Sequence, residues 1–206
     1  MNYIENLIER YPELSVCKES ISELTEIILS CYNAGGKILL CGNGGSAADC
    51  EHIAGELLKG FMSKRSLNEE KIKMLEKNIG RETALKLQGA IPAIPLPSII
   101  GVISAFANDV DPDLVYAQLV YAFAKPEDVL IAISTSGNSK NAVLSAKVAK
   151  SLGIKVCALT GASGGELSKI ADVTVCVPEA ETYKVQEYHL PVYHAVCAEA
   201  ERIIFG

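Results

Sequence analysis

Apolar residues at helical spacing open the chain. A first stripe begins at Ile4 and Leu7, and a second continues through residues 21–31. Three- and four-residue intervals of this kind are typical of an amphipathic helix with one buried face. Pro12 interrupts the pattern, because proline lacks the amide hydrogen that a helix interior needs. The sequence therefore predicts helical structure over residues 2–33, broken near Pro12.

Short apolar runs then alternate with helical segments. Runs typical of buried strands cover residues 37–41, 128–134, 154–160 and 173–177, and a proline-rich extended segment covers 91–97. Helices are expected after residue 46, over about 112–124, from 139 to about 152, and over about 182–204. This alternation predicts an α/β fold of three layers, in which a parallel sheet of about five strands carries helices on both faces. Segment 91–97 would be an edge strand, because proline cannot donate to a central ladder.

One segment departs from the alternation. Residues 63–90 are rich in charge and helical in character. We interpret them as an insertion of one or two short helices rather than as a domain. The remaining chain is long enough for one substantial core, so residues 1–206 are predicted to form a single domain.

Composition narrows the class of protein. Aromatic residues make up only 6% and Trp is absent, so aliphatic side chains must fill the core, as in parallel-sheet proteins. The formal net charge of −6 argues against nucleic acid as the main partner, although a local pocket for one phosphate remains compatible with it. No apolar run approaches the roughly 20 residues that cross a membrane, and no signal peptide is visible.

The number and placement of the cysteines indicate the redox state of the compartment in which the protein works. Seven cysteines are present, none in a Cys-x-x-Cys pair, and several lie inside apolar runs. Free buried thiols in a reducing environment explain this pattern better than disulfides or a cysteine metal site. The protein is therefore expected to be cytoplasmic.

Two strand-to-helix turns are candidates for binding an anion. Residues 42–46 read Gly-Asn-Gly-Gly-Ser, and residues 134–139 read Ser-Thr-Ser-Gly-Asn-Ser. Glycines let the backbone approach an anion closely, and a helix start offers free N–H groups. Each loop alone is also explained by ordinary turn and capping chemistry. On two strands of one parallel sheet, whose ligands bind beyond the carboxyl ends, the pair favours a phosphorylated sugar.

Polar side chains on two helices are candidates for chemistry. His52 and Glu56 are four residues apart and share a helix face next to the first loop. Gln186 and His194 are eight apart on the last helix, about two turns, which is weak evidence by itself. His189 is assigned a structural or surface role. Together the four could bind a borderline metal such as zinc, or supply a carboxylate base and an imidazole acid without it.

These motifs resemble those of the phosphoheptose isomerases, a family with the SIS (sugar isomerase) fold. The resemblance rests on residues 42–49, His52-x-x-x-Glu56, residues 134–139, and residues 185–189 with His194. It covers the chain except for about residues 63–90, where relatives have a short loop. That segment is interpreted as a lid, a subunit contact or a specificity element.

The resemblance implies a role for each matching residue. Glu56 would be the catalytic base and His194 the acid, in the conversion of sedoheptulose 7-phosphate to D-glycero-D-manno-heptose 7-phosphate through an enediolate. It also implies a homotetramer whose sites are shared between subunits. One zinc per subunit would be held by His52, Glu56, Gln186 and His194. The substrate-binding residues would be Asn43, Gly44, Gly45, Ser46, Glu56, Asn108, Asp109, Ser134, Thr135, Ser136, Ser139 and Gln186.

Two other functions compete with this one. A non-catalytic SIS adaptor that binds a replication initiator would resemble the loops, but such adaptors lack the His and Glu positions. A regulator that senses a sugar phosphate would carry a DNA-binding helical domain, and the sequence has no such segment. Both alternatives therefore explain fewer of the residues than an aldose–ketose isomerase does.

Overall fold

Five parallel strands form the sheet at the centre of the molecule. The computed structural model describes residues 2–206. Its strands are β1 (Ile38–Cys41), β2 (Ala93–Pro95), β3 (Val129–Ile133), β4 (Lys155–Thr160) and β5 (Val173–Cys176), in the spatial order β2-β1-β3-β4-β5. The predicted parallel sheet is confirmed, and the proline-rich strand β2 lies at its edge, as expected.

Alternate residues of the strands supply two separate cores. On β1, Leu39 packs on one side of the sheet while Ile38 and Leu40 pack on the other. Neighbouring β3 divides in the same way, with Leu130 and Ile131 in opposite cores. Successive side chains of a strand point to opposite faces, so a strand buried on both faces reads as a continuous apolar run. That is why the sequence shows these strands without polar alternation.

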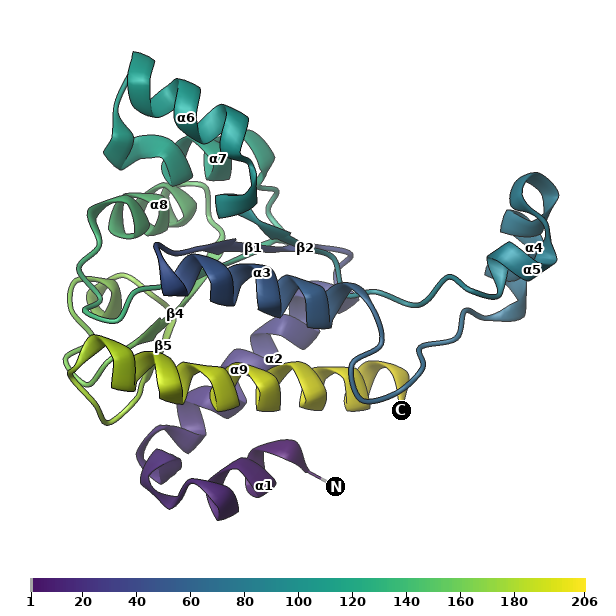
Figure 1. Cartoon of the computed structure of the whole chain (residues 1–206), viewed down its shortest axis with the longest axis horizontal. Coiled ribbons are helices and arrows are strands. Elements are labelled where there is room, and N and C mark those ends of the chain that lie inside the picture. The colour runs from purple at the N-terminus through teal and green to yellow at the C-terminus, as the bar shows by residue number, and fades with distance from the viewer. Residues whose placement is uncertain (1) are drawn as a thin grey trace.

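Helices cover both faces of the sheet (Figure 1). One face carries α1 (Tyr3–Arg10), α2 (Lys18–Asn33), α3 (Gly45–Leu58) and α9 (Thr182–Phe205). The other carries α6 (Ile100–Asp109), α7 (Val115–Phe123) and α8 (Lys140–Ser151). The three-layer prediction is therefore confirmed. The helix α6 could not be recognised in the sequence. Its residues are mostly apolar or small on every side of the helix, so they form no apolar stripe opposite a polar face.

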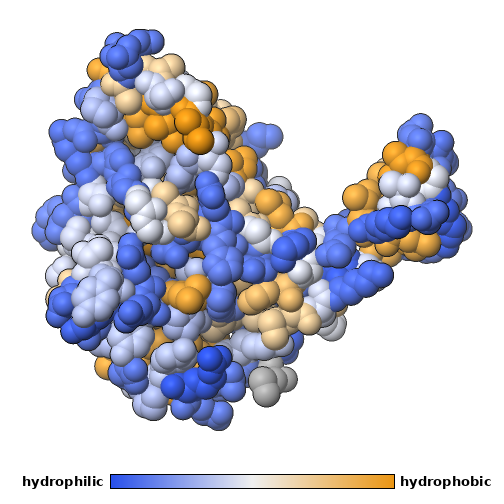
Figure 2. All heavy atoms as spheres, in the orientation of Figure 1, coloured by the Kyte–Doolittle hydropathy of each residue, from blue (hydrophilic) through white to orange (hydrophobic). Residues whose placement is uncertain are grey.

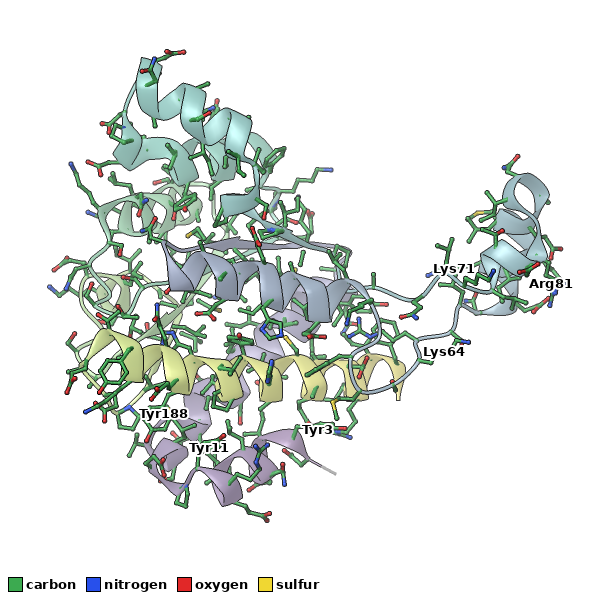
Figure 3. The ribbon with its side chains drawn as sticks, in the orientation of Figure 1. Tyr3, Tyr11, Lys64, Lys71, Arg81 and Tyr188 are labelled. Atoms are coloured by element: carbon green, nitrogen blue, oxygen red, sulfur yellow. The ribbon has the colours of Figure 1, made fainter. Side chains whose placement is uncertain are left out.

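The predicted insertion is helical and projects from the body. It consists of α4 (Glu69–Ile79) and α5 (Arg81–Ala84), joined to the body by two extended segments (Figure 1). We call residues 63–90 the arm. Arg81 pairs with Glu69 and Glu76 within the arm, far from Lys64 at its root (Figure 3). Figure 2 shows apolar atoms on the surface of the arm, where Met74 and Leu85 are exposed.

Across residues 2–206, none of the helices combines the length and the apolar character that a membrane span requires.

Candidate active site

The two helices that carry the candidate catalytic residues lie side by side. α3 and α9 contact one another, and they run in the same direction (Figure 1). Near the start of both, the amide of Gln186 lies so close to Gly45 that a Cβ there would require the amide to shift. Further along both, His194 meets His52. The start of α3 is the end of the first glycine-rich loop, so this packing joins the loop to the polar side chains.

Two imidazoles and one carboxylate meet between these helices. His52 Nε2 lies 3.2 Å from Glu56 Oε1 and 3.3 Å from His194 Nε2. Lys59 Nζ donates to Glu56 Oε2 at 3.1 Å. The Glu56 side chain is 14% exposed and that of His52 is 42% exposed. The carboxylate is therefore largely covered while the imidazole faces solvent, as a site open to a small molecule requires.

Buried polar groups lie behind His52. Tyr193 is buried, and its hydroxyl contacts His52 Nδ1 at 2.9 Å and Asp49 Oδ1 at 3.3 Å. Burial raises the pKa values of both Asp49 and Tyr193. Burial, followed by the charge of His52, lowers the pKa of His194, with Glu56 opposing. Neither Asp49 nor Tyr193 is marked by the sequence as a site residue, because a tyrosine in an apolar helix stripe looks like an ordinary core residue.

The two candidate anion-binding loops lie next to each other. They follow β1 and β3, which pair directly in the sheet. Asn43 of the first loop and Asn141 of α8 exchange two amide hydrogen bonds, of 2.8 and 2.9 Å. Parallel strands place their carboxyl ends at one edge of the sheet, so the loops share that edge. Asn141 was not among the predicted residues, although its place in the first turn of α8, directly after the serine-rich loop, is a usable signal.

The serine-rich loop is ordered by its own hydroxyls and by one glycine. Ser134 Oγ and Ser139 Oγ are 2.9 Å apart, and Ser139 precedes the first turn of α8. Gly137 has a positive φ of 67°, and a Cβ there would collide with the carbonyl oxygen of Gly164. At the loop surface, Thr135 is partly exposed and Ser136 is exposed. Hydroxyls and free N–H groups at a helix start form a suitable receptor for a phosphate group.

The structure separates some predicted residues from this cluster. Gln186 lies two turns of α9 before His194, about 12 Å of helix rise, and packs on Gly45. Asn108 and Asp109 lie at the end of α6, on the other face of the sheet, where Asn108 Nδ2 donates to Asp109 Oδ1 at 2.8 Å. His189 is buried and its Nε2 lies 3.2 Å from the carbonyl oxygen of Thr160, which gives it the predicted structural role.

The side chains at the cluster suit zinc in type and in pairwise spacing. Two atoms that each lie about 2.0–2.2 Å from a tetrahedral zinc are about 3.3–3.6 Å apart. The separation of 3.3 Å for His52–His194 lies at the lower end of that range, and the 3.2 Å for His52–Glu56 lies slightly below it. Within residues 2–206, however, no group of three or more His, Cys, Asp or Glu side chains already converges as a metal site. The donor chemistry fits zinc, and Gln186 would have to leave Gly45 to join it.

The root of the arm is tied to both helices. Arg65 Nη1 donates to the carbonyl oxygen of Leu57 at 2.6 Å, and its Nη2 donates to that of Glu56 at 2.8 Å. Glu201 of α9 accepts from the backbone N–H groups of residues 61–63. A helix terminus leaves its last carbonyl groups without partners, and the two bonds from Arg65 satisfy two of them at the end of α3. Together, the bonds of Arg65 and Glu201 hold the turn that carries Glu56 against α9.

Comparisons with known proteins identify relatives in both sequence and fold. Two models of the SIS domain match residues 2–89 and 98–197. A phosphoheptose isomerase of Clostridium acetobutylicum is 39% identical over 188 residues, covering 91% of this chain and 84% of its own. Among solved structures, a phosphoheptose isomerase from Francisella tularensis matches with a TM-score of 0.78 at 28% identity, covering 97% of this chain and 95% of that chain. One from Neisseria gonorrhoeae matches with a TM-score of 0.72 at 31% identity, covering 96% and 98%.

Proposed function

Because this chain belongs to the phosphoheptose isomerases of the SIS domain family, we propose that it converts sedoheptulose 7-phosphate to D-glycero-D-manno-heptose 7-phosphate. The broader class is established by these relatives: the protein is a sugar-phosphate aldose–ketose isomerase. The observation that carries the specific proposal is the meeting of Glu56, His52 and His194 between α3 and α9. The first of these helices begins at an anion-binding loop.

The phosphate is assigned to the loops at the carboxyl edge of the sheet. Ser134, Thr135, Ser136 and Ser139 would donate hydroxyl hydrogens to its oxygens, beside the start of α8. Asn43 to Ser46 and Gln186 would contact the sugar, because Gln186 lies over the first loop. Asn108 and Asp109 remain proposed substrate contacts. They lie on the other face of the sheet, so they would reach a site only at a subunit boundary or by movement of α6.

The reaction moves a proton between adjacent carbons. Glu56 would remove the proton bonded to carbon, and the electron pair left behind would form the enediolate. His194 would transfer a proton to or from the neighbouring oxygen, and Glu56 would return its proton to the other carbon. The low exposure of Glu56 favours this role, because a largely covered carboxylate leaves little room for bulk water next to the reacting carbon. Lys59, at 3.1 Å, orients the carboxylate.

Zinc is proposed as the cofactor, one ion per subunit. His52, Glu56 and His194 would hold it, with Gln186 as the fourth proposed ligand. Bound there, the ion would supply positive charge next to the oxygens that become negative during the reaction. A tightly bound Glu56 would not be free to act as a base, so either its bond to zinc would be loose or the position of the ion would shift during turnover.

The enzyme is further proposed to be a cytoplasmic homotetramer with sites shared between subunits. Exposed apolar residues support association. Ile100 and Val102 on α6, and Met74 and Leu85 on the arm, are apolar side chains that a partner would cover. Contiguous exposed apolar surface is typical of protein–protein contacts.

One experiment tests the activity and the cofactor together. Purified protein is incubated with sedoheptulose 7-phosphate and product formation is followed by NMR, with and without a chelator. We expect turnover that the chelator abolishes and added zinc restores. Turnover that the chelator leaves unchanged would contradict zinc. Turnover only with a pentose or hexose phosphate would show that the enzyme is an isomerase of a different sugar phosphate. No turnover with any sugar phosphate would favour the adaptor function.

A further inference from the structure

A groove of about 450 Å³ lies between α1 and α9. Its wall is mostly apolar and reaches the candidate active site. The lining comes from α1, from α9 and from the chain just before the arm, and it includes Tyr3, Leu7, Tyr11, Phe61, Leu190 and His194. Leu190 is 41% exposed, so the groove presents apolar surface to solvent.

An acidic hollow adjoins this groove and shares Glu187 with it. The hollow adds the carboxylates of Glu13 and Glu179. Its lysine, Lys184, pairs with Glu181, which lies outside the lining. Within residues 2–206, neither Glu179 nor Glu187 forms an ion pair with a lysine or arginine. This end of the groove therefore presents uncompensated negative charge.

The arm carries the opposite charge. Residues 63–90 contain seven Lys and Arg and four Asp and Glu, a net charge of +3, which leaves −9 for the rest of the chain. Arg81 is paired within the arm. Lys71, Lys73 and Lys77 have no carboxylate within ion-pair distance in the part of the chain that the structure describes. The lysines of α4 are therefore free to pair with another molecule.

Apolar side chains lie between these lysines. Lys71, Met74 and Lys77 are three residues apart and share one face of α4. Met74 is 62% exposed, and Leu85 next to α5 is 49% exposed. The two helices of the arm pack on each other and project away from the body (Figure 1). Helices of 11 and 4 residues are marginal by themselves in water, so a partner surface would stabilise them.

We propose that the arm of one subunit seats in the groove between α1 and α9 of a second copy of this chain. Met74 and Leu85 fill the apolar part of the groove, and the lysines of α4 face Glu179 and Glu187. Within one chain the groove lies next to the root of the arm, because residues 61–62 line it. A two-fold axis near that point lets two subunits exchange their arms at once, as an isologous contact requires.

The exchange brings a second subunit to the active site. His194 lies in the wall of the groove, and the ring of Phe61 packs against it with centroids 5.5 Å apart. A seated arm covers this side of the site and excludes water from it. This consequence rests on the proposed function, since it needs His194 to be catalytic, whereas the docking of the arm does not.

A cross-linking experiment tests the contact. Met74→Cys and Leu190→Cys are made in a Cys176→Ser background, because the other six natural cysteines are buried. The two chains are expressed together with different tags, purified through both tags and treated with a short bismaleimide. We expect a linked pair that joins position 74 of one chain to position 190 of the other, identified by mass spectrometry. Tyr121→Cys, which is exposed on the other face of the sheet, replaces Leu190→Cys in the control and should give no link.

Charge reversal provides a second measurement. Lys71→Glu combined with Lys77→Glu should raise the dissociation constant of the oligomer, measured by analytical ultracentrifugation. The expected increase is at least about two- to five-fold, the range of one exposed ion pair. Adding Glu179→Lys and Glu187→Lys should restore the parent value. Lys147→Glu, on the exposed side of α8, is the matched control and should leave association unchanged.

The outcomes separate this contact from the proposed activity. Links between two Met74→Cys chains without a link to position 190 would show that arms meet arms, and would overturn the proposal. An oligomer active on sedoheptulose 7-phosphate that gives no link and no response to charge reversal would overturn it alone. A monomeric protein would refute both the arm exchange and the homotetramer. A linked oligomer inactive on that sugar would refute only the substrate.

Discussion

Arg65, at the root of the arm, and Glu201, on α9, form a buried ion pair. The guanidinium Nε donates to Glu201 Oε1 at 2.7 Å, and both side chains are almost fully excluded from solvent. Arg65 also stacks over the ring of Phe205, at 4.9 Å from its centroid. The pair joins the end of α3 to α9, the two helices that form the candidate active site.

An Arg65→Met variant is therefore expected to be strongly destabilised. It leaves the Glu201 carboxylate buried without its partner, which typically costs about 3–5 kcal/mol. Urea unfolding followed by circular dichroism measures the loss. The double variant Arg65→Met with Glu201→Gln should recover part of it, because neither charge remains and the amide oxygen can still accept from the backbone N–H groups of Met62 and Ser63. A single variant within about 1 kcal/mol of the parent, inside the range of exposed pairs, would contradict the assignment of a buried pair.

Replacement of Glu56 by Gln should abolish most activity without unfolding the protein. The amide keeps the shape of the side chain but cannot take a proton, and general-base catalysis typically contributes about 10²–10⁴-fold. We expect kcat to fall by that factor while KM stays within a few-fold. Glu51→Gln is the matched control on the same helix, since Glu51 accepts from Ser98 Oγ away from the cluster. Equal activity of the two variants would exclude Glu56 as the base.

His189 should make the protein less stable in acid. Burial lowers the pKa of this imidazole from 6.5 to about 4, and its Nδ1 has no partner within the described chain. The unfolded chain therefore binds a proton more readily than the folded one between these pH values. Stability contributed by neutral His189 is present above about pH 6.5 and declines by about 3 kcal/mol as the pH falls to 4.

The measurement is the free energy of unfolding at pH 7 and pH 4.5, for the parent and for His189→Gln. The variant should lose less stability between the two pH values than the parent does, because the amide does not titrate. Equal losses in both proteins would show that His189 does not drive the acid dependence.

The cysteines should differ sharply in reactivity. Six of the seven are buried, and Cys176 is partly exposed. Burial raises the pKa values of Cys41, Cys157 and Cys197 to about 12, which suppresses the reactive thiolate. Iodoacetamide should therefore label Cys176 first in the native protein and all seven thiols after unfolding. Mass spectrometry counts the labels, and fast native labelling of Cys41 or Cys197 would contradict the buried arrangement.

Sequence periodicity was sufficient for the architecture. The buried strands, the interruption at Pro12, the helical insertion and the two loops all depend on local patterns of apolar, glycine and serine residues. Those patterns act over a few residues, so they are legible without knowing what each element packs against. α6 was the exception, because an apolar helix without a polar face has no stripe to recognise.

The pairing of α3 with α9 was decided by tertiary structure alone. His52 and His194 are 142 residues apart, and nothing in either local pattern states that they meet or that Gln186 lies against Gly45 instead. The position of Tyr193 between Asp49 and His52 is equally hidden. Local spacing determines which face a side chain occupies on its own helix. The register between two helices depends on close packing of side chains far apart in the chain, and that packing exists only in the folded molecule.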